Sequence, residues 1–373
     1  MDIIIIILII CCSCCCIILG GGGYYYITTQ NVIKSSNNNT SATTPTSDSY
    51  SSSPTSDSYS STPKTTPIPM LYSFTTHTFT NANATGQKGP TLDAVKNAYS
   101  SASWATSYIN MTNNDGIQLW TVPVTGNYTI RAVGASGGDT SDGYKGGKGI
   151  DLSITTILNK GELIKILVGQ KGITANANNV NASGGGGGTF VVRDTKTPII
   201  VAGGGGGATS NLVLSSYSGN KNGDNGVSTT KGGGGGKGHQ SNMIATPGID
   251  GNGATTSAET IGNGNGSPGG GLLSNGVFYN TSQPVGIGFI NGGLGGGDTG
   301  GFGGGAGGYA DYRFSGGGAG GYSGGAGAIY DGNSNGLPFY TSGGGGSYSI
   351  TGKFNSAPAY NNGDGSVIIT LNN

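Results

Sequence analysis

The sequence GGGGGTFVVRDTKTPIIVAGGGGG, Gly184–Gly207, contains the strongest structural pattern of this chain. Two β-branched runs, Thr189–Arg193 and Pro198–Ala202, stand close together here, which predicts a β-hairpin closing on Asp194–Thr197. A glycine block runs directly into the first strand, and another directly follows the second. Flexible linkers are not expected to alternate directly with strands in this way. We therefore expect the glycine blocks to belong to the ordered body.

Glycine supplies 78 of the 373 residues, much of it in such blocks. An extended helix with three residues per turn directs its N–H and C=O groups sideways, and these groups must be paired when they are buried. Neighbouring glycine helices can pair them because no Cβ keeps the backbones apart. The blocks therefore predict a bundle of polyglycine-II helices. Its marker positions are Gly184, Gly188, Gly203, Gly207, Gly232, Gly236, Gly303, Gly316 and Gly343. Aromatic residues between the later blocks, Phe302, Tyr309, Phe314 and Tyr322, are expected to cover its edges.

Other segments outside the glycine blocks also have strand patterns. They are β-branched, alternate and are bounded by turn residues, which is typical of a half-buried antiparallel sheet. The expected strands are Ile117–Trp120, Tyr128–Val133, Ile150–Ile157, Leu163–Val168 and Ser366–Leu371, with a further aromatic strand-like stretch over Leu71–Phe79. One short helix is expected after Gly89-Pro90, with Thr91 as its cap. The sequence thus predicts a mainly β fold.

The N-terminus is a separate unit. An apolar run, Ile3–Leu19, contains every cysteine of the chain, so no disulfide can staple the body within one chain. We interpret residues 1–23 as an uncleaved membrane anchor whose transmembrane helix, Ile3–Leu19, is at the short end of the spanning range, with the h-region of a cleaved signal peptide as the alternative. The spacing of the cysteines does not suit zinc. The candidates for lipidation are Cys11, Cys12, Cys14, Cys15 and Cys16.

Residues 24–70 are rich in Ser, Thr and Pro and contain a near-repeat, Pro45–Ser53 and Pro54–Thr62. Such a composition cannot form a core, so we expect a disordered stalk, or a linker with no further role. The ordered glycine-rich domain is expected over residues 71–373. N-x-S/T sequons are consistent with export of the chain. They begin at Asn38, Asn39, Asn83, Asn110, Asn127, Asn181, Asn265 and Asn280.

Composition argues against catalysis and against nucleic acid. The 17 basic residues balance the 17 acidic ones, so no basic surface is available to neutralise phosphates. Histidine occurs only at His77 and His239, and no acid–base or nucleophile constellation is apparent. We therefore expect no enzyme and no cofactor. A weak calcium-loop pattern, Asp331, Asn333 and Asn335, has Ser342 where a glutamate should close it, and an ordinary Asn/Gly turn is the alternative.

A family resemblance adds to these predictions of fold and function. It rests on YTIRAVGASGG (Tyr128–Gly138), KGELIKILVGQKG (Lys160–Gly172), GGGGGTFVV, PIIVAGGGGG and, later, GGFGGGAGGY (Gly300–Tyr309) and GDGSVIITL (Gly363–Leu371). In this order, these segments resemble the glycine-rich, ligand-binding extracellular domain of the anaplastic lymphoma kinase and leukocyte tyrosine kinase type. Two preceding segments, FTNANATGQKGPTL (Phe79–Leu92) and GIQLWTVPVTG (Gly116–Gly126), look like the lead-in of glycine-rich surface proteins of phages, large DNA viruses and microbes. The resemblance implies an antiparallel β-sandwich of tumour-necrosis-factor-like topology joined to polyglycine-II helices. It also implies binding of a small protein ligand. The chain has no kinase segment and no cysteines in its body, so signalling does not carry over.

Three functions are compatible with these features. The first is a membrane-anchored, outward-facing adhesion or recognition protein, held by residues 3–19, whose rigid body presents loops to a host-surface glycan or protein. The second is a structural surface or virion coat protein without a specific ligand. The third is a receptor-like binder of a small soluble protein.

Overall fold

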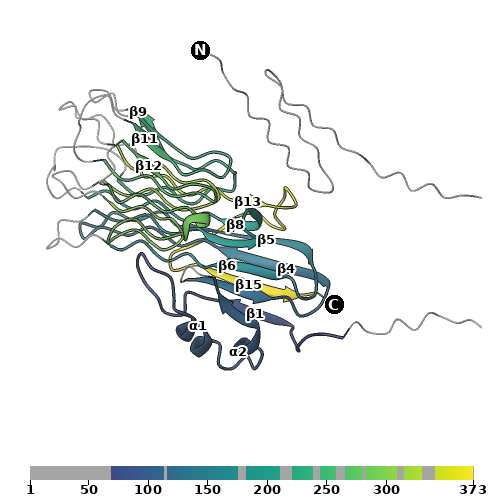
Figure 1. Cartoon of the computed structure of the whole chain (residues 1–373). Helices are drawn as coiled ribbons and strands as arrows, with labels where there is room; N and C mark the ends of the chain where they lie inside the picture. The colour runs from purple at the N-terminus through teal and green to yellow at the C-terminus, as the bar shows by residue number, and fades with distance from the viewer. Residues whose placement is uncertain are drawn as a thin grey trace, which may run out of the picture. The chain divides into compact units, whose positions relative to one another are not determined.

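The computed structural model describes residues 69–112, 116–174, 182–210, 221–237, 244–257, 265–279, 283–308, 315–329 and 341–372 (Figure 1). The chain divides into two units, Met1–Lys64 and Thr65–Asn373, and all described residues lie in the second. The expected membrane segment, its cysteines, the stalk and the calcium-loop residues lie outside the described residues. Within the described ranges, no helix is long and apolar enough to cross a membrane.

One layer of the body is a five-stranded antiparallel sheet. In spatial order its strands are β1 (Thr76–Phe79), β15 (Ser366–Leu371), β4 (Gly126–Val133), β5 (Gly149–Leu158) and β14 (Ala359–Asn361). The expected strands at β4, β5 and β15 are therefore confirmed, while the aromatic stretch before them forms a strand only from Thr76 onward.

The second layer is a six-stranded antiparallel sheet. Its strands are, in order, β13 (Tyr348–Ser349), β8 (Thr197–Ala202), β7 (Thr189–Arg193), β6 (Leu163–Leu167), β3 (Ile117–Thr121) and β2 (Ile109–Met111). The hairpin predicted from the opening sequence is formed by β7 and β8, with a register shift between Val191 and Val192. The short strands β2 and β13 were not expected from the sequence.

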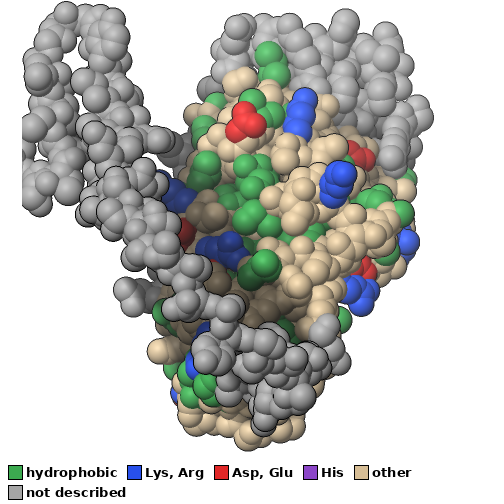
Figure 2. Space-filling view, turned by 90° about the vertical axis from the view of Figure 1, so that its right-hand side faces the viewer, with side chains coloured by type: hydrophobic (Ala, Val, Ile, Leu, Met, Phe, Trp, Pro, Cys, Tyr) green, Lys and Arg blue, Asp and Glu red, His purple; other side chains and the backbone are tan. Residues whose placement is uncertain are grey.

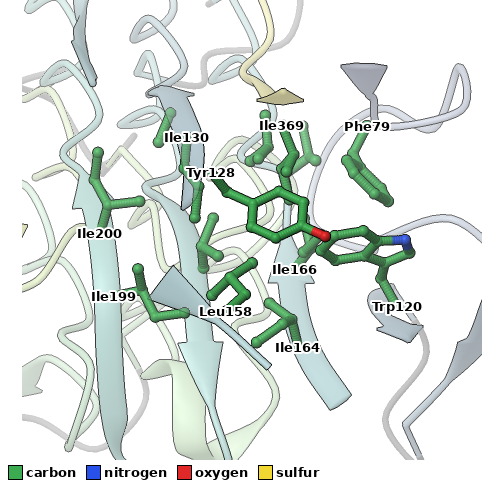
Figure 3. Packing of buried hydrophobic residues seen from close by; sticks show 14 of the residues in the cluster. Phe79, Trp120, Tyr128, Ile130, Leu158, Ile164, Ile166, Ile199, Ile200 and Ile369 are labelled. Carbon is green, nitrogen blue, oxygen red and sulfur yellow. The ribbon is translucent and has the colours of Figure 1, made fainter. Parts of the chain in front are cut away.

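The two sheets pack face to face on a common apolar core. Tyr128 and Ile130 of β4 point inward with no exposed surface, as their alternation predicted. They meet Ile164, Ile166 and Ile200 of the six-stranded sheet (Figure 3). Antiparallel sheets sharing one core in this way form a β-sandwich.

In the six-stranded sheet, β7 and most of β8 are buried on both faces, which corrects the expectation of half-buried strands for these two, while β6 and β2 keep exposed residues on their outer side. Phe190 and Val192 of β7 point away from the sandwich core, yet both are fully covered. Phe289 and Phe302 cover them, and the rings of Phe190 and Phe289 stack at 5.0 Å. Phe302 has no exposed surface, so it belongs to this second core instead of covering an edge. The glycine-rich part therefore supplies the apolar cover for this sheet.

Helices are few. Helix α1 (Leu92–Ala98) confirms the expected helix, since the Thr91 side chain accepts a hydrogen bond from the backbone N–H of Ala94. Helix α2 (Ala105–Tyr108) follows, and a single 3-10 turn, η1 (Phe289–Asn291), lies in the glycine-rich part. Both α-helices flank the sandwich near β1 and β2 (Figure 1).

A four-stranded sheet lies against the glycine-rich part and was not predicted. Its order is β12 (Val277–Phe278), β11 (Thr255–Ser257), β10 (Ile244–Thr246) and β9 (Gly236–Lys237), with β11 and β12 parallel. Ala245 packs beneath it against Ala326 and Ile329. Its strands are too short and too rich in Thr and Gly to give a strand pattern in the sequence.

Candidate recognition surface

The hairpins of the sandwich continue into the glycine runs. Beyond the last residue of β4, Gly134 donates to the carbonyl of Ile150 at 2.8 Å, and Gly137 donates to that of Gly147 at 2.9 Å. The β6–β7 pair is extended in the same way, with Gly187 donating to Gln170 at 3.0 Å. Strand and glycine run are therefore one continuous piece of ordered backbone, and this places the glycine runs at one end of the sandwich (Figure 1).

Hydrogen bonds of the run Gly184–Gly188 repeat every third residue. Gly185 and Gly188 donate to Ala306 and Gly303 on one neighbouring run, both at 2.9 Å. The N–H groups of Gly184 and Gly187 go to a second neighbour, at Ile173 and Gln170, and that of Gly186 goes to a third, at Gly205. Successive N–H groups thus point in three different directions around the run.

The run Gly203–Gly207 has the same pattern. Gly204 and Gly207 donate to the carbonyls of Gly320 and Gly317, both at 2.9 Å. The N–H groups between them go to two further neighbours. Each run is therefore surrounded by backbone partners, and its own carbonyls accept in turn. Gly186 accepts from Gly320, for example.

Close backbone contact explains why these positions are glycine. A Cβ added at Gly184 would lie 1.8 Å from the carbonyl oxygen of Thr299, and one at Gly343 would lie 1.8 Å from that of Gly233. The other marker positions behave alike, with the nearest backbone atom at 2.0–2.8 Å from the added Cβ: Gly188, Gly203, Gly207, Gly232, Gly303 and Gly316. Gly236 differs, since it lies in β9 opposite Ala245.

A small group of polar side chains stands at the far end of these runs. The β4–β5 hairpin turns there through Thr140 and Tyr144, whose backbones pair at 2.9 Å. The Lys221 ammonium lies over the Tyr144 ring, 5.2 Å from its centroid. Lys145 and Lys171 both face one carboxylate oxygen of Asp139, at 3.4 and 4.0 Å. We call the group Asp139, Tyr144, Lys145, Lys171 and Lys221 the glycine tip.

Charges at the glycine tip are of two kinds. The Lys145 side chain pairs with Asp139 but is 70% exposed, so its ammonium is accessible to a partner. Lys221 is almost fully covered, and burial lowers the pKa of its ammonium, which the carboxylate of Asp142 partly offsets. Nearby, burial raises the pKa of the Asp224 carboxyl. A buried cation over an aromatic ring stiffens the turn, whereas the exposed lysine is suited to contact.

The opposite end of the body contains Pro69, the first residue that the structure describes. Lys160, in the β5–β6 turn, donates its ammonium to the carbonyl of Pro69 at 2.6 Å, and Leu71 donates to Pro123 at 2.9 Å. Figure 2 views the body from this side and shows hydrophobic side chains among lysine and arginine. We call this the sandwich end. It lies at the other end of the hairpins from the glycine tip.

The sequence identified the glycine runs but missed the tip. The signal that could have revealed it is DTSDGYK, residues 139–145, a charged interruption between glycines. Of the other candidates, Tyr322 is half-buried and stacks on Tyr348 at 4.8 Å, while Tyr309, Phe314 and the calcium-loop residues lie outside the described residues. In the described ranges, no group of three or more His, Cys, Asp and Glu residues could hold a metal ion.

Comparison with known proteins gives a partial similarity to a receptor. No protein-family model matches the chain. The chain is 39% identical over 95 residues to the leukocyte tyrosine kinase receptor of Mus musculus, which is 25% of this chain and 11% of that receptor. The chain therefore matches only a small part of the receptor's length. This similarity fits a receptor-like or recognition role.

Proposed function

We propose that this chain is an outward-facing surface recognition protein that binds a partner without catalysing a reaction. Residues 3–19 hold it in a membrane, residues 24–70 act as a stalk, and the glycine tip meets a host-surface glycan or protein. The glycine runs form a polyglycine-II bundle that holds the tip rigid. A rigid binding surface loses little conformational entropy when it binds. The tumour-necrosis-factor-like topology stays a prediction.

One observation carries this proposal. The backbone hydrogen bonds of the glycine runs repeat every third residue and go to three different neighbours, which is the period of an extended three-fold helix. A linker or a low-complexity tail has no such repeat. Beyond the sandwich, the backbone groups of the runs are buried and paired with one another. We infer that this paired backbone serves to hold the tip rigidly.

A second observation favours the orientation. Pro69, the first described residue, accepts a hydrogen bond from Lys160 at the sandwich end, and the glycine tip lies at the other end of the same hairpins. Among the described residues, those of the tip lie at the end of the hairpins away from Pro69, which suits an outward-facing role. The partial similarity to a receptor supports recognition over a coat role.

Cysteine labelling on intact cells tests the proposal, because the body contains no cysteine. The five native cysteines are changed to alanine, and one new cysteine is introduced in the full chain, Lys145→Cys at the tip or Lys196→Cys at the sandwich end. Both residues are exposed. A membrane-impermeant maleimide should label both variants on intact cells. Labelling that appears only after lysis would contradict the outward orientation.

The same two variants test the binding surface. Displaying cells are applied to a glycan array and to a panel of host cells, before and after coupling of a bulky polymer maleimide. Coupling at Lys145→Cys should abolish saturable binding, and coupling at Lys196→Cys should leave it intact. Equal loss for both variants would place the binding surface elsewhere. Absence of saturable binding with either unmodified variant would favour a structural coat.

A further inference from the structure

The outer face of the five-stranded sheet is polar. Four threonines lie in one row across β1, β15, β4 and β5, and their register partners are Thr76, Thr370, Thr129 and Thr155. Their hydroxyls pair at 2.9 Å within the first two strands and at 3.3 Å within the last two. This face therefore meets solvent. Two isoleucines interrupt it: Ile368 is partly covered, whereas the surface of Ile157 is 58% exposed.

Asn127 is the cross-strand partner of this isoleucine. The two residues are directly opposite each other in the β4–β5 ladder. Both point outward, because their neighbours Tyr128 and Leu158 are buried in the core. Cβ atoms of such partners are about 4.5–5.5 Å apart. Asn127 is also exposed, and it begins the sequon Asn127-Tyr128-Thr129.

We propose that Asn127 carries an N-linked glycan and that the first sugar covers Ile157. The inference rests on the proposed function, since the chain must enter a secretory compartment. There the Nδ2 atom of Asn127 bonds to C1 of a lipid-linked oligosaccharide. The bond from C1 to the pyrophosphate oxygen of the carrier breaks, the pyrophosphate leaves with the electron pair, and the amide nitrogen gives up a proton. The apolar face of the sugar then removes the isoleucine from water.

The other sequon asparagines among the described residues differ from Asn127 in their exposure or in their neighbours. Asn83 and Asn110 are exposed, but the cross-strand partner of Asn110 is Leu119, which is already partly covered. Asn265 is only 2% exposed. A Cβ added at its neighbour Gly266 would lie 1.8 Å from the carbonyl oxygen of Gly316, so the folded chain has no room for a sugar there.

Glycopeptide mapping tests the site. The full chain is expressed in a eukaryotic secretory host with a C-terminal tag that carries an independent sequon. Cleavage before aspartate yields Asp115–Gly138, which contains Asn127 as its only sequon. Enzymatic release of the glycan in heavy water should mark Asn127 in most surface chains, and Asn265 in none.

Three outcomes of the mapping would contradict the proposal. A glycosylated tag with an unmodified Asn127 would overturn the glycan site while leaving export intact. An unmodified tag would mean that the chain is not exported, which overturns the proposed function and this inference together. Occupancy of Asn265 equal to that of Asn127 would show that the folded surface does not select the site.

A coupling experiment tests the contact with Ile157. Native deglycosylation should lower the Tm of the full chain by about 1–2 °C, an ordinary shift for a small change in a domain of this size. In the Ile157→Thr variant the shift should vanish, because no apolar side chain is left to uncover. Thr129→Ser keeps the sequon and should behave as the natural chain, whereas Asn127→Gln should start at the lower Tm. An undiminished shift in Ile157→Thr would overturn the contact.

Discussion

At the scale of single residues, the glycine runs are defined by space rather than by flexibility. Gly184→Ala would place a methyl group 1.8 Å from the carbonyl oxygen of Thr299. Since backbone cannot yield easily, we expect a loss of about 3 kcal/mol in the free energy of unfolding. Gly363→Ala is the matched control, because its added Cβ meets only the Asn361 side chain at 3.9 Å. Denaturant unfolding measures both. Equal stability of the two variants would contradict close backbone packing.

His77 makes a second residue-scale prediction, about pH. Its ring packs edge-on against Phe79, Tyr99 and Trp104, and burial lowers its pKa from 6.5 to about 4. The folded state therefore binds the proton more weakly than the unfolded state. Stability that is present above pH 6.5 should fall as the pH drops from about 6.5 to about 4.

The variant His77→Phe isolates this contribution from the titration of carboxylates. Thermal unfolding of both proteins is followed between pH 7 and pH 4. As the pH falls, the natural chain should lose more stability than the variant, because only the natural chain has the His77 ring to protonate. A constant difference over this range would show that the His77 ring is protonated as easily in the folded chain as in the unfolded one.

At the scale of elements, the six-stranded sheet depends on the glycine-rich part for its second core. Phe302 is fully buried, and a Cβ at Gly89 or Gly116 would meet its ring at 2.7 and 2.5 Å. Phe302→Ala should therefore cost about 3–5 kcal/mol in the free energy of unfolding. Tyr360→Ala, on the exposed edge strand β14, should change it by no more than about 0.5 kcal/mol. Denaturant titration separates the two. A small effect of Phe302→Ala would mean that the sheet is stable without this cover.

The sequence predicted those elements that are marked by residues within or next to the element itself. The cap at Thr91 marked α1, and the β-branched runs marked β4–β8. Burial of β7 on both faces was not predictable, because the covering residues Phe289 and Phe302 are about 100 residues away along the chain, in glycine-rich segments without a strand or helix pattern. The four-stranded sheet was not predicted because its strands are only two or three residues long, too short to show an alternating pattern. The glycine tip requires knowing which runs pair, and this is set by contacts between distant segments.

At the scale of the whole molecule, the continuity of strand and glycine run implies cooperative folding. The glycine runs have no side chains to form a core, so their order depends on backbone pairing with several neighbours at once. Gly186 donates to Gly205, and Gly205 donates to Ala135 just beyond β4. A run could open only if its neighbours lost their partners too. We therefore expect the runs to unfold together with the sandwich, without a stage in which the glycines are free.

Hydrogen exchange tests this final prediction. Amide groups of peptides covering residues 182–188 and 203–209 should exchange as slowly as those of β4, because buried paired N–H groups exchange through opening of the whole body. Peptides covering residues 351–358, which are mostly exposed, should exchange quickly and provide the control. In Gly184→Ala, protection of the two glycine peptides and of β4 should fall in parallel. Fast exchange of the glycine peptides beside a protected β4 would show that the runs are linkers, and the tip would then have no rigid support.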